Sequence, residues 1–179
     1  MDNNQKMHPM VTSKTKDMVI TALFIAFIYV ATNINIQLPI SINNGGLVHL
    51  GNAMLLIAAF MLGGRKAAIA GAFGMGLFDL LSPYYMWAPF TFVIRLLQGF
   101  VAGELATRNG RKGKSLMWNI IAIVAGAAIM IPGYYLANVA LYGSWVTPIT
   151  GVPGDAIQNI IGALVSLPVV FALKKTKRF

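Results

Sequence analysis

The chain has 179 residues, of which 57% are hydrophobic and only 11% charged. This balance is typical of an integral membrane protein and excludes an ordinary soluble globular domain. The formal net charge is +9, but the basic residues stand in small clusters beside apolar runs, which argues against nucleic-acid binding. Because the chain contains no cysteine, disulfides and thiolate metal sites are excluded.

Lysine and arginine alternate along the chain with stretches that contain neither. Thirteen of the fourteen basic residues fall in four short segments, at 6–16, 65–66, 108–114 and 174–178. The intervening connections, near 37–49, 82–86 and 142–154, contain none. Positively charged loops remain in the cytoplasm during insertion. The pattern therefore predicts an all-α membrane protein with six transmembrane helices in one bundle and both termini in the cytoplasm.

The apolar runs give approximate bounds for these helices. In chain order, the predicted spans are 18–36, 48–63, 67–81, 87–107, 116–141 and 155–173. The first, fourth, fifth and sixth spans are about as long as a helix that crosses a bilayer. The second and third spans are shorter. The predicted organisation is a cytoplasmic tail over 1–17, a six-helix substrate-binding domain over 18–173 and a basic cytoplasmic tail over 174–179.

With this topology, nearly all strongly polar side chains within the spans fall in the outer half of the bundle. Most aromatic residues share this bias, whereas an interfacial aromatic belt would occupy both faces. A concave outer site walled by aromatic rings explains both observations. The candidate ligand-binding residues are His49, Asn52, Asp79, Tyr84, Tyr85, Trp87, Arg95, Asn138 and Asn159. The inner half has no matching set, which argues against a continuous polar channel.

Arg95 is the one basic residue inside a predicted span. It lies roughly 12 Å deep at 1.5 Å per helical residue, and a charge at such a position is a candidate functional residue. Two interpretations remain open. Arg95 binds the ligand, or it forms a structural ion pair with a carboxylate such as Asp79.

Two further segments are candidates for function. The outer connection ends in Asn43, Asn44, Gly45 and Gly46, a sequence that favours a turn and a mobile flap over the site. In the first span, two small residues stand four positions apart, Ala22 and Ala26. This spacing allows close helix approach, and a helix at the edge of the bundle can offer it to another protein.

Motifs for catalysis are absent from the sequence. Residues 113–115 read GKS, the end of a phosphate-binding loop, but that loop needs glycine where Arg108 stands. The sequence also lacks the common metalloprotease and serine-hydrolase motifs. We therefore expect neither an enzyme nor an ATPase site, and no cofactor or metal.

Several segments resemble the substrate-binding S components of energy-coupling factor (ECF) transporters, in the branch of riboflavin, pyridoxine and hydroxymethylpyrimidine binders. The resemblance covers about 18–173 and is carried by VHLGNA at 48–53, the segment 63–76, DLLS at 79–82 and IRLLQG at 94–99. It implies a six-helix bundle in a bacterial plasma membrane that captures a vitamin at its extracellular side. It also implies a transmembrane coupling (T) subunit, docked at Ala22 and Ala26, and two ATPase subunits.

The ligand is left open among several vitamins. A small heteroaromatic such as pyridoxine or hydroxymethylpyrimidine suits aromatic stacking with a few hydrogen bonds, while riboflavin is a further candidate. A carboxylated vitamin such as pantothenate would pair with Arg95. The alternatives of another class are a stand-alone secondary carrier and a small membrane enzyme. A self-sufficient carrier needs polar residues in the inner half, and an enzyme needs a nucleophile or metal set; the sequence indicates neither.

Overall fold

The computed structural model describes residues 13–39 and 47–176. In this part of the chain lie six α-helices: α1 (Ser13–Asn33), α2 (Gly51–Leu62), α3 (Gly64–Leu80), α4 (Ala88–Thr107), α5 (Leu116–Tyr142) and α6 (Val152–Lys175). Each predicted span corresponds to one of them, which confirms the all-α class. Four helical segments of this part are long and apolar enough to cross a membrane: Ser13–Asn33, Tyr85–Gly110, Leu116–Tyr142 and Thr147–Lys175.

Short strands and 3₁₀ helices lie between the long helices. Strands β1 (Asn35–Gln37) and β2 (Leu47–His49) pair antiparallel, and three 3₁₀ helices connect longer elements: η1 (Tyr85–Trp87), η2 (Arg108–Gly110) and η3 (Thr147–Gly151). The strands correct the expectation that the first span runs to 36 and the second starts at 48. Helix α1 ends early because the Asn35 side chain donates hydrogen bonds to the backbone carbonyls of Thr32 and Asn33.

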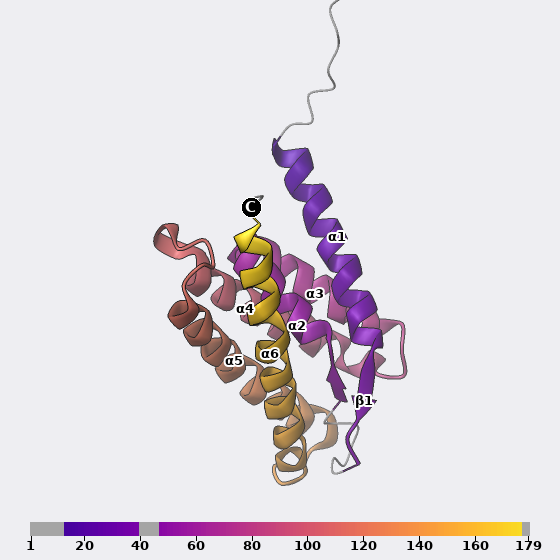
Figure 1. Cartoon of the computed structure of the whole chain (residues 1–179). Helices are drawn as coiled ribbons and strands as arrows, with labels where there is room; N and C mark the ends of the chain where they lie inside the picture. Colours follow the sequence, from indigo (N-terminus) through magenta and orange to yellow (C-terminus); the bar gives the residue numbers. More distant parts are fainter. Residues whose placement is uncertain (1–12, 40–46, 177–179) are drawn as a thin grey trace, which may run out of the picture.

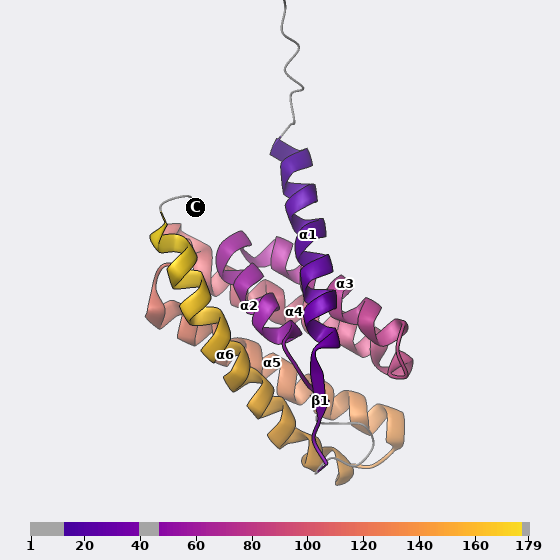
Figure 2. The same cartoon turned by 45° about the vertical axis from the view of Figure 1, so that its right-hand side comes forward.

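Helix α2 is the centre of the bundle. Its 12 residues span about 18 Å, well short of a 30 Å hydrocarbon core. It packs against α1, α3, α4 and α6, and Figures 1 and 2 show it surrounded by longer helices. Leu55, Ala58 and Phe60 are completely buried in the main hydrophobic core. A helix that is apolar around most of its circumference, with Asn52 as its one polar side chain, belongs in such a position.

Helices α3 and α4 approach each other through small residues. A Cβ atom added to Gly103 would lie 2.5 Å from the Cα atom of Gly64, and one added to Gly99 would lie 2.7 Å from the backbone oxygen of Ala67. Backbone contacts this short exclude any larger side chain. The Gly99 and Gly103 pair therefore serves packing inside the bundle.

We expect Gly103→Ala to lower the melting temperature of the detergent-solubilised protein, because the new methyl group would push α3 and α4 apart at a cost of about 1–3 kcal/mol. The control is Gly76→Ala, where the added Cβ meets the flexible Phe92 side chain at 3.3 Å rather than backbone. Thermal unfolding monitored by circular dichroism compares the two. Equal melting temperatures for both variants would contradict this account of the crossing.

Lys14 and Lys16 stand at the start of α1, and Lys174 and Lys175 stand at the end of α6; these two helix ends lie at the same end of the bundle (Figure 1). Lys66 forms a salt bridge with Asp17 at 2.6 Å. The Lys174 ammonium group donates to the backbone oxygen of Phe60 at 2.8 Å and also to that of Lys112. The salt bridge joins α1 to α3, and the Lys174 contacts join α6 to α2 and to the α4–α5 connection. Strands β1 and β2 lie at the opposite end.

Candidate functional site

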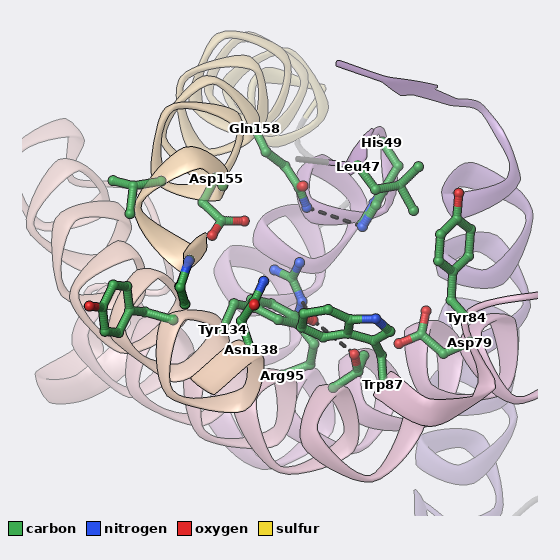
Figure 3. Close-up of a pocket in the computed structure, with 15 residues that line it drawn as sticks. Leu47, His49, Asp79, Tyr84, Trp87, Arg95, Tyr134, Asn138, Asp155 and Gln158 are labelled. Carbon is green, nitrogen blue, oxygen red and sulfur yellow. Dashed lines mark hydrogen bonds between the residues drawn. The ribbon is translucent and has the colours of Figure 1, made fainter. Parts of the chain in front are cut away.

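A cavity opens at the end of the bundle that carries β2, η1 and η3. The space between its walls is about 620 Å³ when the open solvent at its mouth is included. Because α3 and α5 end here while α4 and α6 begin, residues distant in the sequence converge on it (Figure 3). The lining residues are Leu47, His49, Asp79, Tyr84, Trp87, Thr91, Arg95, Tyr134, Tyr135, Asn138, Pro148, Gly151, Val152, Asp155 and Gln158.

The structure brings most of the sequence-predicted residues to this cavity. The ones that line it are His49, Asp79, Tyr84, Trp87, Arg95 and Asn138. Asn52 and Asn159 are buried and belong to the hydrogen-bond network around Arg95. Tyr85 is 61% exposed and lies outside the lining. The predicted flap, Asn43 to Gly46, lies outside the described residues.

Aromatic rings form one wall of the cavity. Trp87 is buried, and its ring centroid lies 6.2 Å from that of Tyr134 at an angle of 47°. Tyr84 stacks on Phe78 with centroids 6.2 Å apart, and its hydroxyl donates to Gln37 Oε1 at 2.7 Å. That hydrogen bond ties β1 to the segment between α3 and α4. The wall therefore offers flat apolar surfaces held in place by polar contacts.

Arg95 is 1% exposed and all its described hydrogen bonds go to neutral groups. Its Nε donates to the Tyr134 hydroxyl at 3.1 Å, and its Nη1 donates to Asn52 Oδ1 at 3.0 Å and Gln98 Oε1 at 2.7 Å. The sulfur of Met130 lies 3.2 Å from the same Nη1. Helices α2, α4 and α5 thus hold the guanidinium together, and its orientation is determined before any ligand arrives.

Gln158 completes this arrangement from α6. In the amide orientation that satisfies its neighbours, its oxygen accepts from Arg95 Nη2 at 2.9 Å and from His49 Nε2 at 3.1 Å, while its nitrogen donates to the Leu47 carbonyl at 2.7 Å. Among the described residues, no salt bridge joins Arg95 to Asp79 or to another carboxylate. The ion pair considered from the sequence is therefore not formed, because neutral acceptors occupy the guanidinium.

A second set of hydrogen bonds holds the side chains that accept from Arg95. Asn52 Oδ1 also accepts from Gln98 Nε2 at 3.0 Å, and Asn52 Nδ2 lies 3.4 Å from Asn159 Oδ1. Asn159 Nδ2 donates to the Met130 sulfur at 3.1 Å and to the Asp155 carbonyl at 2.9 Å. Side chains from four helices are thereby linked into one buried network, which is costly to disturb because every member relies on the others.

Several polar groups of the cavity remain open to a ligand. Asn138 is 4% exposed, and its Oδ1 has no hydrogen-bond partner among the described residues. The side chains of Asp79 and Asp155 point into the cavity from opposite sides, with Arg95 between them (Figure 3), and the Asp79 carboxyl is hydrogen-bonded to the Thr91 side chain. A buried polar atom without a partner is costly unless something binds to it. These groups therefore mark the surface that a ligand would contact.

Sequence reasoning missed some members of the site. Asp155 and Gln158 lie at the outer end of the last predicted span. This position, close to that of Asn159, could have identified them as candidates. Gln98 stands one helical turn from Arg95, where side chains of one helix meet. Met130 gave no signal, because a methionine in an apolar span is indistinguishable from a core residue.

The predicted docking residues lie on a separate surface. Ala22 and Ala26 are exposed on α1, whereas Thr21, Ile28 and Thr32 of the same helix are buried. The start of α1 projects beyond the other helices in both views (Figures 1 and 2), although Asp17 pairs with Lys66 of α3. The small-residue pair is therefore not used for packing within the described bundle.

Comparison with known proteins assigns the chain to a family. The model of the ECF-type riboflavin transporter S component matches residues 12–175. An uncharacterized protein in gap 3'region of Pyrococcus woesei is 26% identical over 144 residues, which cover 80% of this chain and 93% of that protein. The thiamine precursor transporter HmpT of Lactococcus lactis subsp. cremoris is 26% identical over 147 residues, covering 82% and 81%. Because the family model matches nearly the whole chain, this membrane protein belongs to the ECF-type riboflavin transporter S component family, a family of vitamin-uptake subunits.

Proposed function

We propose that this protein is the substrate-capture subunit of an ATP-driven importer and that it binds pyridoxine or hydroxymethylpyrimidine in the cavity. Family membership supports the capture role, and the name of the HmpT relative supports a thiamine precursor as cargo. The observation that carries the proposal is the cavity itself. It combines buried aromatic rings with a fixed guanidinium and an unpartnered amide oxygen, as a small polar heteroaromatic ring requires.

In the proposed binding mode, Trp87 and Tyr84 contact the faces of the ring while Arg95, Asn138 and Asp79 bind its polar edge. His49, Asn52 and Asn159 act indirectly, because they hold Arg95 or its partners. Strand β2 supplies Leu47 and His49 to the lining, so the adjacent segment Asn43 to Gly46 is the proposed gate. Tyr85 is left out of this mode because it lies outside the lining.

The proposed topology has six membrane crossings with both termini in the cytoplasm of a bacterial cell. The basic residues at the start of α1, the start of α3 and the end of α6 support it, because such residues favour the cytoplasmic side. The cavity lies at the opposite end and would then face the exterior. The short helices α2 and α3 are linked at Gly63, and the first turn of α3 carries Arg65 and Lys66, which the proposed topology places on the cytoplasmic side.

The proposed partners are a T subunit and two ATPase subunits, since the sequence has no nucleotide-binding motif of its own. The exposed Ala22 and Ala26 are the proposed contact with the T subunit. A stand-alone carrier is disfavoured because the polar residues that line the cavity do not continue through the core around α2, which is apolar.

We expect the purified chain to bind a neutral heteroaromatic vitamin but not to accumulate it when it is reconstituted alone into liposomes. Mass spectrometry of small molecules released by denaturation identifies the natural ligand, and calorimetric titration then compares pyridoxine, hydroxymethylpyrimidine and riboflavin. Uptake is measured with the labelled ligand in liposomes with and without the complete importer and ATP.

Two outcomes would contradict the proposal. Accumulation by the chain alone would show a self-sufficient carrier. Failure of all three compounds to bind, together with release of an unrelated molecule, would refute the proposed cargo.

A further inference from the structure

The hydrogen-bonding capacity of Arg95 is almost completely occupied. A guanidinium carries five N–H donors. The Nε hydrogen goes to Tyr134, the two on Nη1 face Asn52 and Gln98, and one on Nη2 goes to Gln158. One Nη2 hydrogen is therefore left without a partner among the described residues, on a side chain that lines the cavity.

A single free N–H restricts what the arginine can bind. Carboxylates and phosphates are best held by two parallel N–H donors. To supply a second one, Arg95 would have to release Gln158, whose amide also binds His49 and the Leu47 carbonyl. A single acceptor atom, such as a hydroxyl oxygen or a ring nitrogen, fits without this disruption.

The other open groups of the cavity are mostly acceptors. Ionised Asp79 and Asp155 can only accept hydrogen bonds; Thr91 contacts the Asp79 carboxyl, which keeps further acceptor capacity, and the unpartnered atom of Asn138 is its carbonyl oxygen. With both carboxylates ionised, they outnumber the one guanidinium, so an anionic group entering the cavity is repelled. A ligand that donates several N–H or O–H groups matches these acceptors.

Building on the proposed function, we propose that the cavity selects an uncharged, donor-rich heteroaromatic ring that presents one acceptor to Arg95, and that it rejects carboxylated and phosphorylated forms of the same ring. Asp79 and Asp155 are the specificity-determining residues. This assignment favours amino- and hydroxymethyl-substituted rings over the carboxylated vitamins considered from the sequence.

The test compares neutral and anionic versions of one ring on the purified full-length chain. Calorimetry with pyridoxine, pyridoxine 5′-phosphate and 4-pyridoxic acid at pH 7.5 should show pyridoxine binding about 100-fold more tightly than either anion, because unpaired like charges are strongly disfavoured in a buried site. Asp79→Asn and Asp155→Asn should each reduce this ratio about tenfold, since each removes one negative charge but keeps the side-chain shape.

Two further variants sharpen the test. Gln158→Leu releases the second Nη2 hydrogen of Arg95 and should improve binding of 4-pyridoxic acid relative to pyridoxine. Glu104→Gln removes a carboxylate from the part of α4 beside Gly64, outside the cavity lining, and should leave the ratio unchanged.

The outcomes separate this inference from the proposed function. Equal affinity for pyridoxine and its anionic forms would overturn the selection rule while heteroaromatic capture remains. A preference for pyridoxine that neither aspartate variant reduces would overturn the role of Asp79 and Asp155. If neither pyridoxine nor hydroxymethylpyrimidine binds the wild-type chain, the proposed cargo fails and the selection rule fails with it. The wild-type comparison decides the rule even where a variant does not fold.

Discussion

Arg95→Met should weaken ligand binding by about tenfold or more, because a hydrogen bond from a charged donor contributes about 1.5–3 kcal/mol. The same change should lower the melting temperature. Gln98 Oε1 accepts from Arg95 at 2.7 Å and would lose this donor inside the bundle. A buried acceptor without a partner costs about 1–3 kcal/mol. Calorimetry and thermal unfolding of the detergent-solubilised protein measure the two effects.

Because no salt bridge joins Arg95 to Asp79, the stability of the double variant Arg95→Met, Asp79→Asn can also be predicted. If the two residues formed a structural pair, Asp79→Asn would restore the stability lost in Arg95→Met. Because neutral groups hold the guanidinium, the double variant should melt no higher than Arg95→Met. Recovery of the melting temperature, with ligand affinity unchanged in the single variant, would remove Arg95 from the binding site.

A matched control exists at the other end of the bundle. Arg111 lies over the Trp118 ring, with its guanidinium carbon 3.9 Å from the ring centroid. Arg111→Met makes the same chemical change far from the cavity lining, so ligand affinity should stay at the wild-type value. Arg95→Lys retains the positive charge but not the planar fork. It should therefore also weaken binding, because the geometry of the network matters as well as its charge.

The helices could be predicted from the sequence because two strong signals act over whole segments. Long apolar runs have few alternatives to a buried or membrane helix, and the basic clusters divide these runs from one another. Strands β1 and β2 could not be predicted in the same way. Each has three residues, and such a strand exists only through its partner across the hairpin.

The site was predictable as a region but not as a set of contacts. The charge of Arg95 inside an apolar span predicts a functional residue, and charge alone suggests a carboxylate such as Asp79 as a partner. The actual partners are neutral and come from other helices as well as its own. Tyr85 and Trp87 show a second limit. They belong to one 3₁₀ turn, whose direction leaves Tyr85 exposed and Trp87 buried.

The second large effect is expected at the predicted docking residues of α1. Ala22 and Ala26 stand one turn apart on the exposed side of α1, where small side chains allow another helix to approach closely. A tryptophan at either position would hold the two helices apart. Helix α1 contributes no lining residue to the cavity, so ligand binding should not depend on this surface.

We therefore expect Ala22→Trp and Ala26→Trp to abolish copurification with the T subunit while ligand affinity changes by less than a few-fold. The matched control is Leu23→Trp on the same helix, where a large exposed side chain already stands and the added bulk is small. Affinity purification of the coexpressed importer measures association, and calorimetry on the isolated variants measures binding. Survival of the complex in both alanine variants would place the contact elsewhere on the bundle. Loss of ligand affinity would mean that the substitutions disturb the fold, since a surface contact alone cannot change a cavity to which α1 adds no side chain.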